Sequence, residues 1–358
     1  MSAKGYVSRG QDHFDAGYCK QNPQRTGFGR GVWGLNALNA SILIRIAATT
    51  NFEQFSSERA STIDGETMTS AALLQFDSGR NNQPGQNRLN WEITPVLVLF
   101  HVGAVAALFF FSWRGLFVAI FLYWMTGGMG LGICFHRLLT HRSFTTPKWF
   151  EYFLTICAVT ALEGGPLQWV ATHRKHHQFA DKDGDPHSPR DGKWWAHAGW
   201  IFVGNQLRQD IATLKRYVPD LAKDNVHVWL TKYHLIPTAI LGLTLFAIGG
   251  FRLVLWGTFL RTVVGLHATW LVNSVSHIWG SRRFETRDTS TNNWWVALIS
   301  FGDGWHNNHH AYPVSARHGL RWYEFDLNWY TILIFKQLGL ASHIHDAPLT
   351  ARTKAKLT

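Results

Sequence analysis

The chain has 358 residues, of which 46% are hydrophobic, and a formal net charge of +11 with histidine counted as neutral. A positive charge of this size can indicate nucleic-acid binding, but no compact basic recognition helix and no RNA-binding sheet motif occurs. The three cysteines are too few for a disulfide framework and lack metal-ligand spacing. We therefore expect no nucleic-acid partner and a basic surface that faces a membrane.

Residues 1–89 are polar, rich in Gly, Asn, Ser and Thr, and contain no candidate span. A mildly apolar patch at 37–48 is interrupted by Arg45 and starts too far into the chain to be a signal peptide. The composition predicts a disordered extension, followed by a membrane domain over 90–358. Two alternatives stay open: translation starts at Met68, or the segment is a transit peptide in a plastid-containing source.

Four apolar segments approach the roughly 20 residues that a helix needs to cross a bilayer. They form two pairs joined by very short turns, 93–113 with 116–135 and 233–249 with 253–276. Each pair predicts a helical hairpin, and two hairpins place both chain ends on one side. The segment 149–170 is less apolar and carries two glutamates, so we expect an interfacial or buried helix there.

Basic residues near the span ends predict the orientation, because cytoplasmic loops carry an excess of Lys and Arg. The short turns hold only Arg114 and Arg252, whereas the opposite face carries Arg137, Arg142, Lys148, Lys223, Lys232, Arg282 and Arg283. We therefore expect an all-α, multi-pass integral membrane protein with four transmembrane helices and a cytoplasmic helical cap, both termini being cytoplasmic. The membrane would be the inner membrane of a bacterium, or that of a plastid or the endoplasmic reticulum in a eukaryote.

Three histidine motifs lie on the predicted cytoplasmic face. They are HRLLTH with His136 and His141, HRKHH with His173, His176 and His177, and HNNHH with His306, His309 and His310. Helical positions i, i+3 and i+4 share one side, so each H-x-x-H-H predicts three imidazoles pointing in one direction. On a regular helix His136 and His141 would point about 140° apart. We therefore expect one of those two to turn off the helix end, or the two to reach different metal ions.

Repetition separates these motifs from single histidines, which are usually ordinary core or surface residues. We keep that interpretation for His13, His101, His227, His234, His343 and His345. Two H-x-x-H-H motifs and an H-x4-H motif, all near predicted span ends, instead indicate a metal centre. Imidazole suits iron, but also zinc, copper and nickel.

The segments GICFHRLLTHRSF, WVATHRKHH, NSVSHIWG and GDGWHNNHHAYP resemble the histidine boxes of the membrane fatty-acyl desaturases, close to the Δ9 type, over about residues 90–339. The resemblance implies a cytoplasmic di-iron centre with the ligands His136, His141, His173, His176, His177, His277, His306, His309 and His310. It also implies that Asn273 holds a metal-bound water, and that Trp169 and Trp270 lie near a bent acyl chain.

This resemblance implies an O2-dependent enzyme that places a cis double bond, most often at Δ9 of a saturated C16 or C18 acyl chain. The acyl carrier is a lipid or coenzyme A, but the basic pair that follows box two in animal acyl-CoA enzymes is absent after Trp200. Box three also has Asp303 where Glu is commoner. No fused cytochrome b5 motif occurs, so we expect a separate electron donor, such as ferredoxin or cytochrome b5, and a basic face suits an acidic partner.

Further residues are candidates for roles around the centre. Asp185, Asp303 and Glu163 could orient imidazoles as neighbouring carboxylates, or they are simply solvated loop acids. Arg261 lies within the fourth apolar segment, where an ionisable group usually has a partner. We expect it to face the protein interior and count it among the substrate-contacting candidates. The closed end of an acyl tunnel is expected near Gly103 and Ala107.

Other functional classes stay open at this level. A related di-iron hydroxylase or ketolase could use similar boxes, although the neighbouring SARHGL segment favours a desaturase. A non-catalytic, histidine-rich membrane metal-binding protein is a further alternative. A metal transporter would place its ligands inside the spans, whereas these histidines lie beyond them.

The N-terminal segment supplies a first prediction. A chain that starts at Met68 should keep its desaturase activity, because nothing before Asn90 resembles the family or supplies a metal ligand. Product formation and membrane insertion of the two lengths are compared in the same host. Well-inserted but inactive shortened protein would contradict this expectation.

Overall fold

The computed structural model describes residues 89–203 and 210–353, so the predicted extension lies outside the described residues except for Leu89. Within these ranges the chain is helical and forms no strand, only isolated bridges such as Thr145 with Ser342. The elements, in which η marks π- or 3₁₀-helices, are α3 Thr94–Phe109, α4 Trp113–Tyr123, η1 Trp124–Thr140, α5 Lys148–Val159, α6 Pro166–Phe179, η2 Pro189–Asp191, η3 Trp195–Gly199, α7 Trp200–Phe202, α8 Ile211–Tyr217, η4 Leu221–Lys223, α9 Asn225–Lys232, α10 Leu235–Val254, η5 Leu255–Leu260, α11 Arg261–Ile278, α12 Trp294–Ile299, α13 His306–Ala311, α14 Leu327–Gln337 and α15 Leu349–Thr353.

The first two apolar segments form helices whose boundaries differ from the prediction. α3 ends at Phe109, and Ser112 starts α4 because its side chain accepts a hydrogen bond from Gly115 N at 3.2 Å. Such an N-cap fixes the turn earlier than the predicted Arg114–Gly115. α4 continues into the π-helical η1, and Trp113–Thr140 is one helical stretch long and apolar enough to cross a membrane.

A break at Gly250 divides the second long apolar stretch. Leu235–Ile278 also has the length and composition to cross a membrane. Gly250, however, has φ 63° and ψ −162°, a conformation that side-chain-bearing residues rarely adopt. The break lies within the turn predicted between 249 and 253, so residues 235–249 of α10 form one arm, and the last residues of α10 continue with η5 and α11 as the other. Two stretches in the described chain therefore pass as membrane helices, and α3 is a shorter apolar helix.

Residues 149–170 form two helices instead of the single one predicted. α5 ends at Val159, and α6 starts at Pro166 after a loop in which Gly164 has φ 96°. The core-facing side of α5 is buried at Leu154, while Trp149 is exposed. Gly130 of η1 lets the two helices approach closely, because a Cβ there would lie 2.6 Å from the Ala158 backbone.

Arg261 faces the protein interior, as expected, and is 2% exposed. Its guanidinium donates hydrogen bonds to Thr160 O at 2.7 Å and Gly257 O at 3.0 Å, and to Thr126 Oγ1 at 3.3 Å. It therefore ties α11 to η1 and to the end of α5. A buried guanidinium is tolerated where such acceptors surround it.

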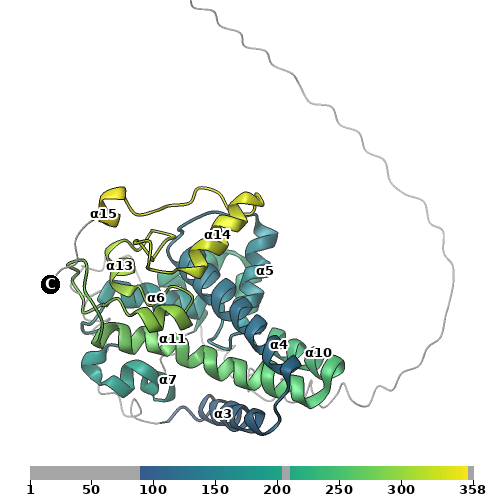
Figure 1. Cartoon of the computed structure of the whole chain (residues 1–358). Coiled ribbons are helices and arrows are strands. Elements are labelled where there is room, and N and C mark those ends of the chain that lie inside the picture. Colours follow the sequence, from purple (N-terminus) through teal and green to yellow (C-terminus); the bar gives the residue numbers. More distant parts are fainter. Residues whose placement is uncertain (1–88, 204–209, 354–358) are drawn as a thin grey trace, which may run out of the picture. The chain divides into compact units, whose positions relative to one another are not determined.

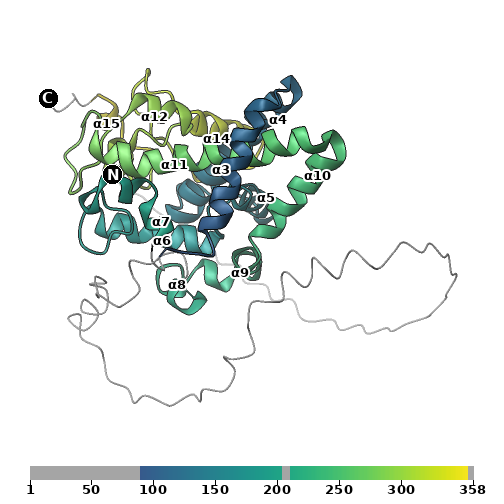
Figure 2. The same ribbon diagram turned by 90° about the horizontal axis from the view of Figure 1, so that it is seen from below.

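The helices that carry the histidine motifs meet at one end of the long helices. α6 and α13 lie beside the C-terminal part of α11 (Figure 1), and rings from all three elements contact one another. α3 crosses α11 (Figure 2), and Leu97 of α3 belongs to a buried cluster with Leu266 and Trp270 of α11 and Ala198 of η3. The C-terminal ends of η1 and α11 thus lie next to α6 and α13, which carry the other histidine motifs.

Candidate metal centre

Five histidines from three elements form the first group, with ligand nitrogens all within 4.8 Å of one another. The group combines the end of η1, one side of α6 and one position of α13: His136, His141, His173, His177 and His309. The Nε2 atoms of His136 and His309 are 3.1 Å apart, and those of His177 and His309 are 3.0 Å apart. This number of imidazoles exceeds what one structural ion needs.

Four histidines form the second group: His176, His277, His306 and His310. His306 Nε2 lies 3.0 Å from His277 Nε2 and 3.1 Å from His310 Nε2. The two groups together contain every histidine that the sequence assigned to the centre. They adjoin each other, since the His177 and His310 ring centroids are 4.6 Å apart.

Each H-x-x-H-H motif divides between the groups, so its three rings do not share one direction as predicted. The i and i+4 members stay together, as His173 with His177 and His306 with His310. The i+3 members, His176 and His309, join the opposite group. Successive helical residues are about 100° apart, so positions i+3 and i+4 diverge enough to reach two neighbouring sites.

The π-helical winding of η1 explains the first motif. The His141 N–H donates to His136 O at 3.2 Å, a hydrogen bond that spans five residues. Such i to i+5 winding brings positions five apart onto one side of the helix. The assumption of a regular helix therefore does not apply. His141 is the C-cap residue just beyond η1, in agreement with the first alternative, whereas both rings belong to one group, which contradicts the second.

Carboxylates hold several rings from behind. Asp185, Asp181 and Asp288 accept from the Nδ1 atoms of His176, His277 and His310 at 3.0, 3.1 and 2.9 Å. An Nδ1–H that donates to a carboxylate leaves the Nε2 lone pair directed at the group, which is the arrangement of a ligating histidine. Asp185 thus has the orienting position considered from the sequence. Asp181 and Asp288 were missed, because neither lies at a fixed spacing from its histidine.

Asp303 belongs to a buried ion-pair network that the sequence did not indicate. Its Oδ2 is 3.5 Å from His136 Nδ1, and its Oδ1 is 2.7 Å from Arg137 Nη1. Arg137 also donates to Asp326 and contacts His318 Nδ1 at 2.9 Å. Burial raises the pKa of Asp303, but Arg137 and then His136 outweigh it, so the pKa falls well below its usual range.

Most of the grouped rings are in the neutral state that metal binding requires, whereas burial lowers the pKa of His176 but Asp185 outweighs it, so that this pKa is raised. Burial holds the pKa values of His173, His177, His306 and His309 well below 6.5, and their neighbouring histidines lower them further. Burial likewise lowers the pKa of His310 to about 4, although Asp288 acts against it. These rings are therefore neutral at neutral pH.

The donor set fits bound metal. The buried Nε2 atoms of His141 and His176 have no hydrogen-bond partner among the described residues. Asp181 and Asp288 accept hydrogen bonds from the Nδ1–H groups of His277 and His310, which leaves a lone pair on each Nε2 atom. Both of these Nε2 atoms face Nε2 of His306. Lone pairs about 3 Å apart repel unless a cation lies between them. Neutral imidazole suits iron among several transition metals.

Two cavities adjoin the histidine groups. The larger, of about 650 Å³, is lined by Trp169, Trp270, Asn273 and His173, among others. The smaller, of about 50 Å³, also has Trp169, His173 and Asn273 in its wall, with His136, His306, Tyr123 and Gly127 beyond them. Trp169 and Asn273 therefore stand between the cavities, next to the metal groups.

Three residues that the sequence associated with substrate lie elsewhere. Arg261, Gly103 and Ala107 line neither cavity. Ala107 is fully buried in a cluster with Ala119, Leu255 and Trp256. Gly127, Tyr123 and Leu131 of the second apolar segment line the smaller cavity instead.

Glu163 does not orient an imidazole. Its Oε2 accepts a hydrogen bond from Trp169 Nε1 at 3.0 Å, and the Trp169 ring stacks on His173 with centroids 5.1 Å apart. The carboxyl group is therefore linked to the centre through an aromatic ring. It lines the larger cavity.

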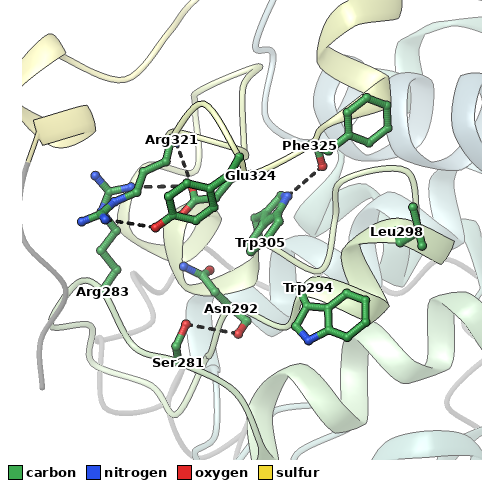
Figure 3. Close-up of a pocket in the computed structure, with 10 residues that line it drawn as sticks. Ser281, Arg283, Asn292, Trp294, Leu298, Trp305, Arg321, Glu324 and Phe325 are labelled. Atoms are coloured by element: carbon green, nitrogen blue, oxygen red, sulfur yellow. Dashed lines mark hydrogen bonds and ion pairs between the residues drawn. The ribbon is translucent and has the colours of Figure 1, made fainter.

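A third pocket, of about 380 Å³, lies behind box three and contains none of the grouped histidines (Figure 3). Trp305, which precedes His306, forms part of its wall and donates from Nε1 to Phe325 O at 2.8 Å. Ser281 N donates to Asn292 O at 2.9 Å on the opposite wall. These contacts fix the turn from which α13 begins.

Buried imidazoles in two adjoining groups, held by carboxylates beside a cavity, form a site that could hold metal ions. Sequence comparison identifies the kind: residues 111–333 match the fatty acid desaturase family. The chain belongs to this family, whose members are oxidoreductases that act on fatty acyl chains.

Named relatives cover most of the chain. An sn-1 stearoyl-lipid 9-desaturase of Anabaena variabilis is 48% identical over 72% of this chain and 94% of its own length. An sn-2 palmitoyl-lipid 9-desaturase of Nostoc sp. (strain 36) is 43% identical over 75% of this chain and 94% of its own length. A chloroplastic palmitoyl-monogalactosyldiacylglycerol delta-7 desaturase of Arabidopsis thaliana is 45% identical over 70% of this chain and 67% of its own length.

The carboxylate behind His277 gives a second prediction. Asp181→Asn should weaken metal binding roughly 10- to 100-fold, because the ring loses its charged hydrogen-bond partner. Metal content and titration of the metal-free protein with ferrous ion measure the effect. Asp183→Asn, two residues away on an exposed side chain, is the matched control and should bind metal like the parent. Equal affinities of the two variants would contradict the orienting role.

Proposed function

We propose that this protein is an O2-dependent acyl-lipid desaturase that places a cis double bond at Δ9 of a saturated C16 or C18 chain. Two of the relatives described above are named as lipid 9-desaturases. The observation that carries the proposal is the pair of histidine groups at the junction of two cavities. Such a junction suits oxidation in the middle of a long chain rather than at its end.

The centre is proposed to hold two irons. The ligands would be the nine grouped histidines, with Asn273 binding a metal-bound water. Iron supplies the dioxygen activation that removal of hydrogen from unactivated methylenes requires. The protein's own residues orient the ligand rings through Asp181, Asp185 and Asp288 and keep them neutral by burial.

Substrate positioning is proposed to depend on the residues between the cavities. Trp169 and Asn273 line both cavities, and Trp270 lines the larger one. An acyl chain extending from one cavity into the other would pass these side chains and the edge of the histidine groups. Large rings at a bend restrict the chain to few conformers and so limit where hydrogen is removed.

The walls of the larger cavity favour a lipid-bound acyl group over acyl-CoA. Its polar lining includes Glu92, Glu163, Gln168 and His234, and no lysine or arginine is among the described residues of the wall. Phosphate-rich carriers are normally bound by Arg and Lys. An uncharged, hydroxyl-bearing headgroup matches this lining better.

The membrane arrangement is proposed from the apolar segments and their charges. α3, α4–η1, α10 and η5–α11 would be four spans in two hairpins, with the histidine groups in a cytoplasmic cap. Arg282 and Arg283 lie just beyond α11, and Arg142 just beyond η1, in agreement with the positive-inside rule. Residues 1–89 would be a polar extension preceding a membrane domain over 90–358.

Electrons are proposed to come from a separate protein, such as ferredoxin or cytochrome b5. Reduction of O2 to water with formation of one double bond needs two electrons besides those of the substrate. The chain's net charge of +11 would favour encounter with an acidic donor and would make it sensitive to salt.

Replacement of a metal ligand tests the function directly. His306→Ala should abolish product while the protein still inserts into the membrane, because His306 bridges His277 and His310 in the second group. Gas chromatography and mass spectrometry of derivatised host lipids detect and locate the double bond. Hydroxylated or oxo products from the parent protein would favour the hydroxylase or ketolase alternative. Near-normal desaturation by the variant would overturn the ligand assignment.

Chain length gives a separate prediction. Gly127→Leu should shift products from C18 toward C16, because a Cβ at Gly127 already lies 3.3 Å from the Phe301 ring and a longer side chain fills the smaller cavity. Gly242→Leu serves as the control, since the nearest atom to its Cβ is 3.8 Å away and it lines neither cavity. Fatty-ester profiles of the two variants decide the matter. An unchanged C18 to C16 ratio in Gly127→Leu would place the chain's end elsewhere.

A further inference from the structure

Glu163 carries a buried carboxyl group that does not orient any of the grouped histidine rings. Its Oε2 accepts from Trp169 Nε1, whereas its Oε1 is buried and has no hydrogen-bond partner among the described residues. The group lines the larger cavity, in the same wall as Trp169, Thr269 and Asn273. An unpaired acid beside a reaction cavity is a candidate for proton transfer.

The described wall of the cavity that Glu163 lines contains no lysine or arginine to balance an ionised carboxylate. The other titratable groups in that wall are Glu92 ahead of α3, His173 of α6, His187, and His234 ahead of α10. Burial raises the pKa of Glu163 to about 7, although hydrogen bonds from Trp169 and Thr269 lower it. Both protonation states are thus accessible at neutral pH.

A polar track leads from this carboxyl group to the histidines. Thr269 and Asn273 are one helical turn apart on α11, and both line the two cavities. His306 and His136 lie in the wall of the smaller cavity next to Asn273. The rest of that turn of α11 is apolar, with Ala268 and Val272 in the wall, so this track is the polar route along the helix.

We propose that Glu163 donates protons to the oxygen atoms of O2 that leave the metal centre as water, by way of Thr269, Asn273 and water in the cavity. The proposal rests on the desaturase function proposed above. Desaturation converts one –CH2–CH2– unit, O2, two protons and two electrons into –CH=CH– and two water molecules. The electrons come from a reduced iron–sulfur or haem protein.

Proton transfer at Glu163 balances in the same scheme. In each transfer the carboxyl O–H bond breaks and leaves a carboxylate, while a new O–H bond forms in the departing water. The carboxylate then takes a proton from solvent water that enters the larger cavity, and the group is ready for the next transfer. General acids of this kind contribute roughly 100-fold or more to a rate.

Glu163→Gln is a nearly isosteric test. Its amide oxygen can still accept from Trp169 Nε1, so the ring beside His173 keeps its support, but the side chain has no acidic proton. We expect unchanged metal content and thermal stability, and single turnover of the chemically reduced, full-length, metal-loaded protein slowed roughly 100-fold. Glu163→Asp keeps an acid on a shorter side chain and should restore part of the rate.

The pH dependence and an optical signal test the proton itself. The protonated form is the donor, so the parent's single-turnover rate should fall as pH rises through about 7, and Glu163→Gln should lose this limb. In the metal-free protein, infrared difference spectra should show a carboxyl C=O band that disappears over the same pH range and is absent from Glu163→Gln.

Three results would overturn the proposal. They are a parent-like rate and pH profile in Glu163→Gln, an unchanged infrared band in that variant, or equal loss of rate in Glu163→Gln and Trp169→Phe with the pH limb retained in both. The last result would assign Glu163 to support of Trp169 alone. Failure of the desaturase function itself is distinguishable, because the parent protein would then make no double bond at any pH.

Discussion

Gathering nine imidazoles against their mutual repulsion is the constraint on which the rest of this structure depends. Each ring must be neutral and must point its free nitrogen at other free nitrogens, which costs free energy without a cation. Burial provides the neutrality, as the lowered pKa values of His173 and His309 show. The carboxylates that accept from Nδ1 of His176, His277 and His310 then determine that Nε2 of each ring faces the other histidines. The fold has to bring these acids from separate loops to the back of the rings.

Backbone geometry decides how the rings divide between the two groups. α6 and α13 use the same rule, in which the i and i+4 rings stay together and the i+3 ring reaches across. η1 needs a different solution because His136 and His141 are five residues apart, and π-helical winding supplies it. Gly127, Leu131 and His136 of the same π-helix line the smaller cavity, so one element contributes to both the histidine site and the cavity.

Much of the architecture was predictable from local pattern. The apolar runs identified the long helices, and Gly249-Gly250 marked the real break, which lies inside α10. The histidine motifs supplied eight of the nine grouped histidines, and only the resemblance to the desaturases added His277. Other features depend on pairings that a sequence does not display. The Ser112 cap moved the first turn, the π-helix violated the assumed 3.6-residue period, and Asp288 meets His310 only through the fold. Gly103 and Ala107, near which the sequence predicted the end of an acyl tunnel, line neither cavity, and the small Ala107 side chain instead permits close packing in a cluster with Trp256.

Charge balance explains why neutral histidines suffice as ligands here. Two divalent ions would bring four positive charges into a buried site whose ligands carry none. Asp181, Asp185, Asp288 and Asp303 lie directly behind the ligand rings, and their pKa values are all held below the usual range despite burial, so they are ionised at neutral pH. Arg137 forms ion pairs with both Asp303 and Asp326. The negative charges that would balance the metal ions lie on the far side of the histidine rings, so the ring atoms that would bind metal stay uncharged. The cavity side of the centre therefore remains apolar enough for an acyl chain. Glu163 differs from these aspartates, because the described wall of the cavity that it lines contains no lysine or arginine and burial raises the pKa of its carboxyl group to about 7.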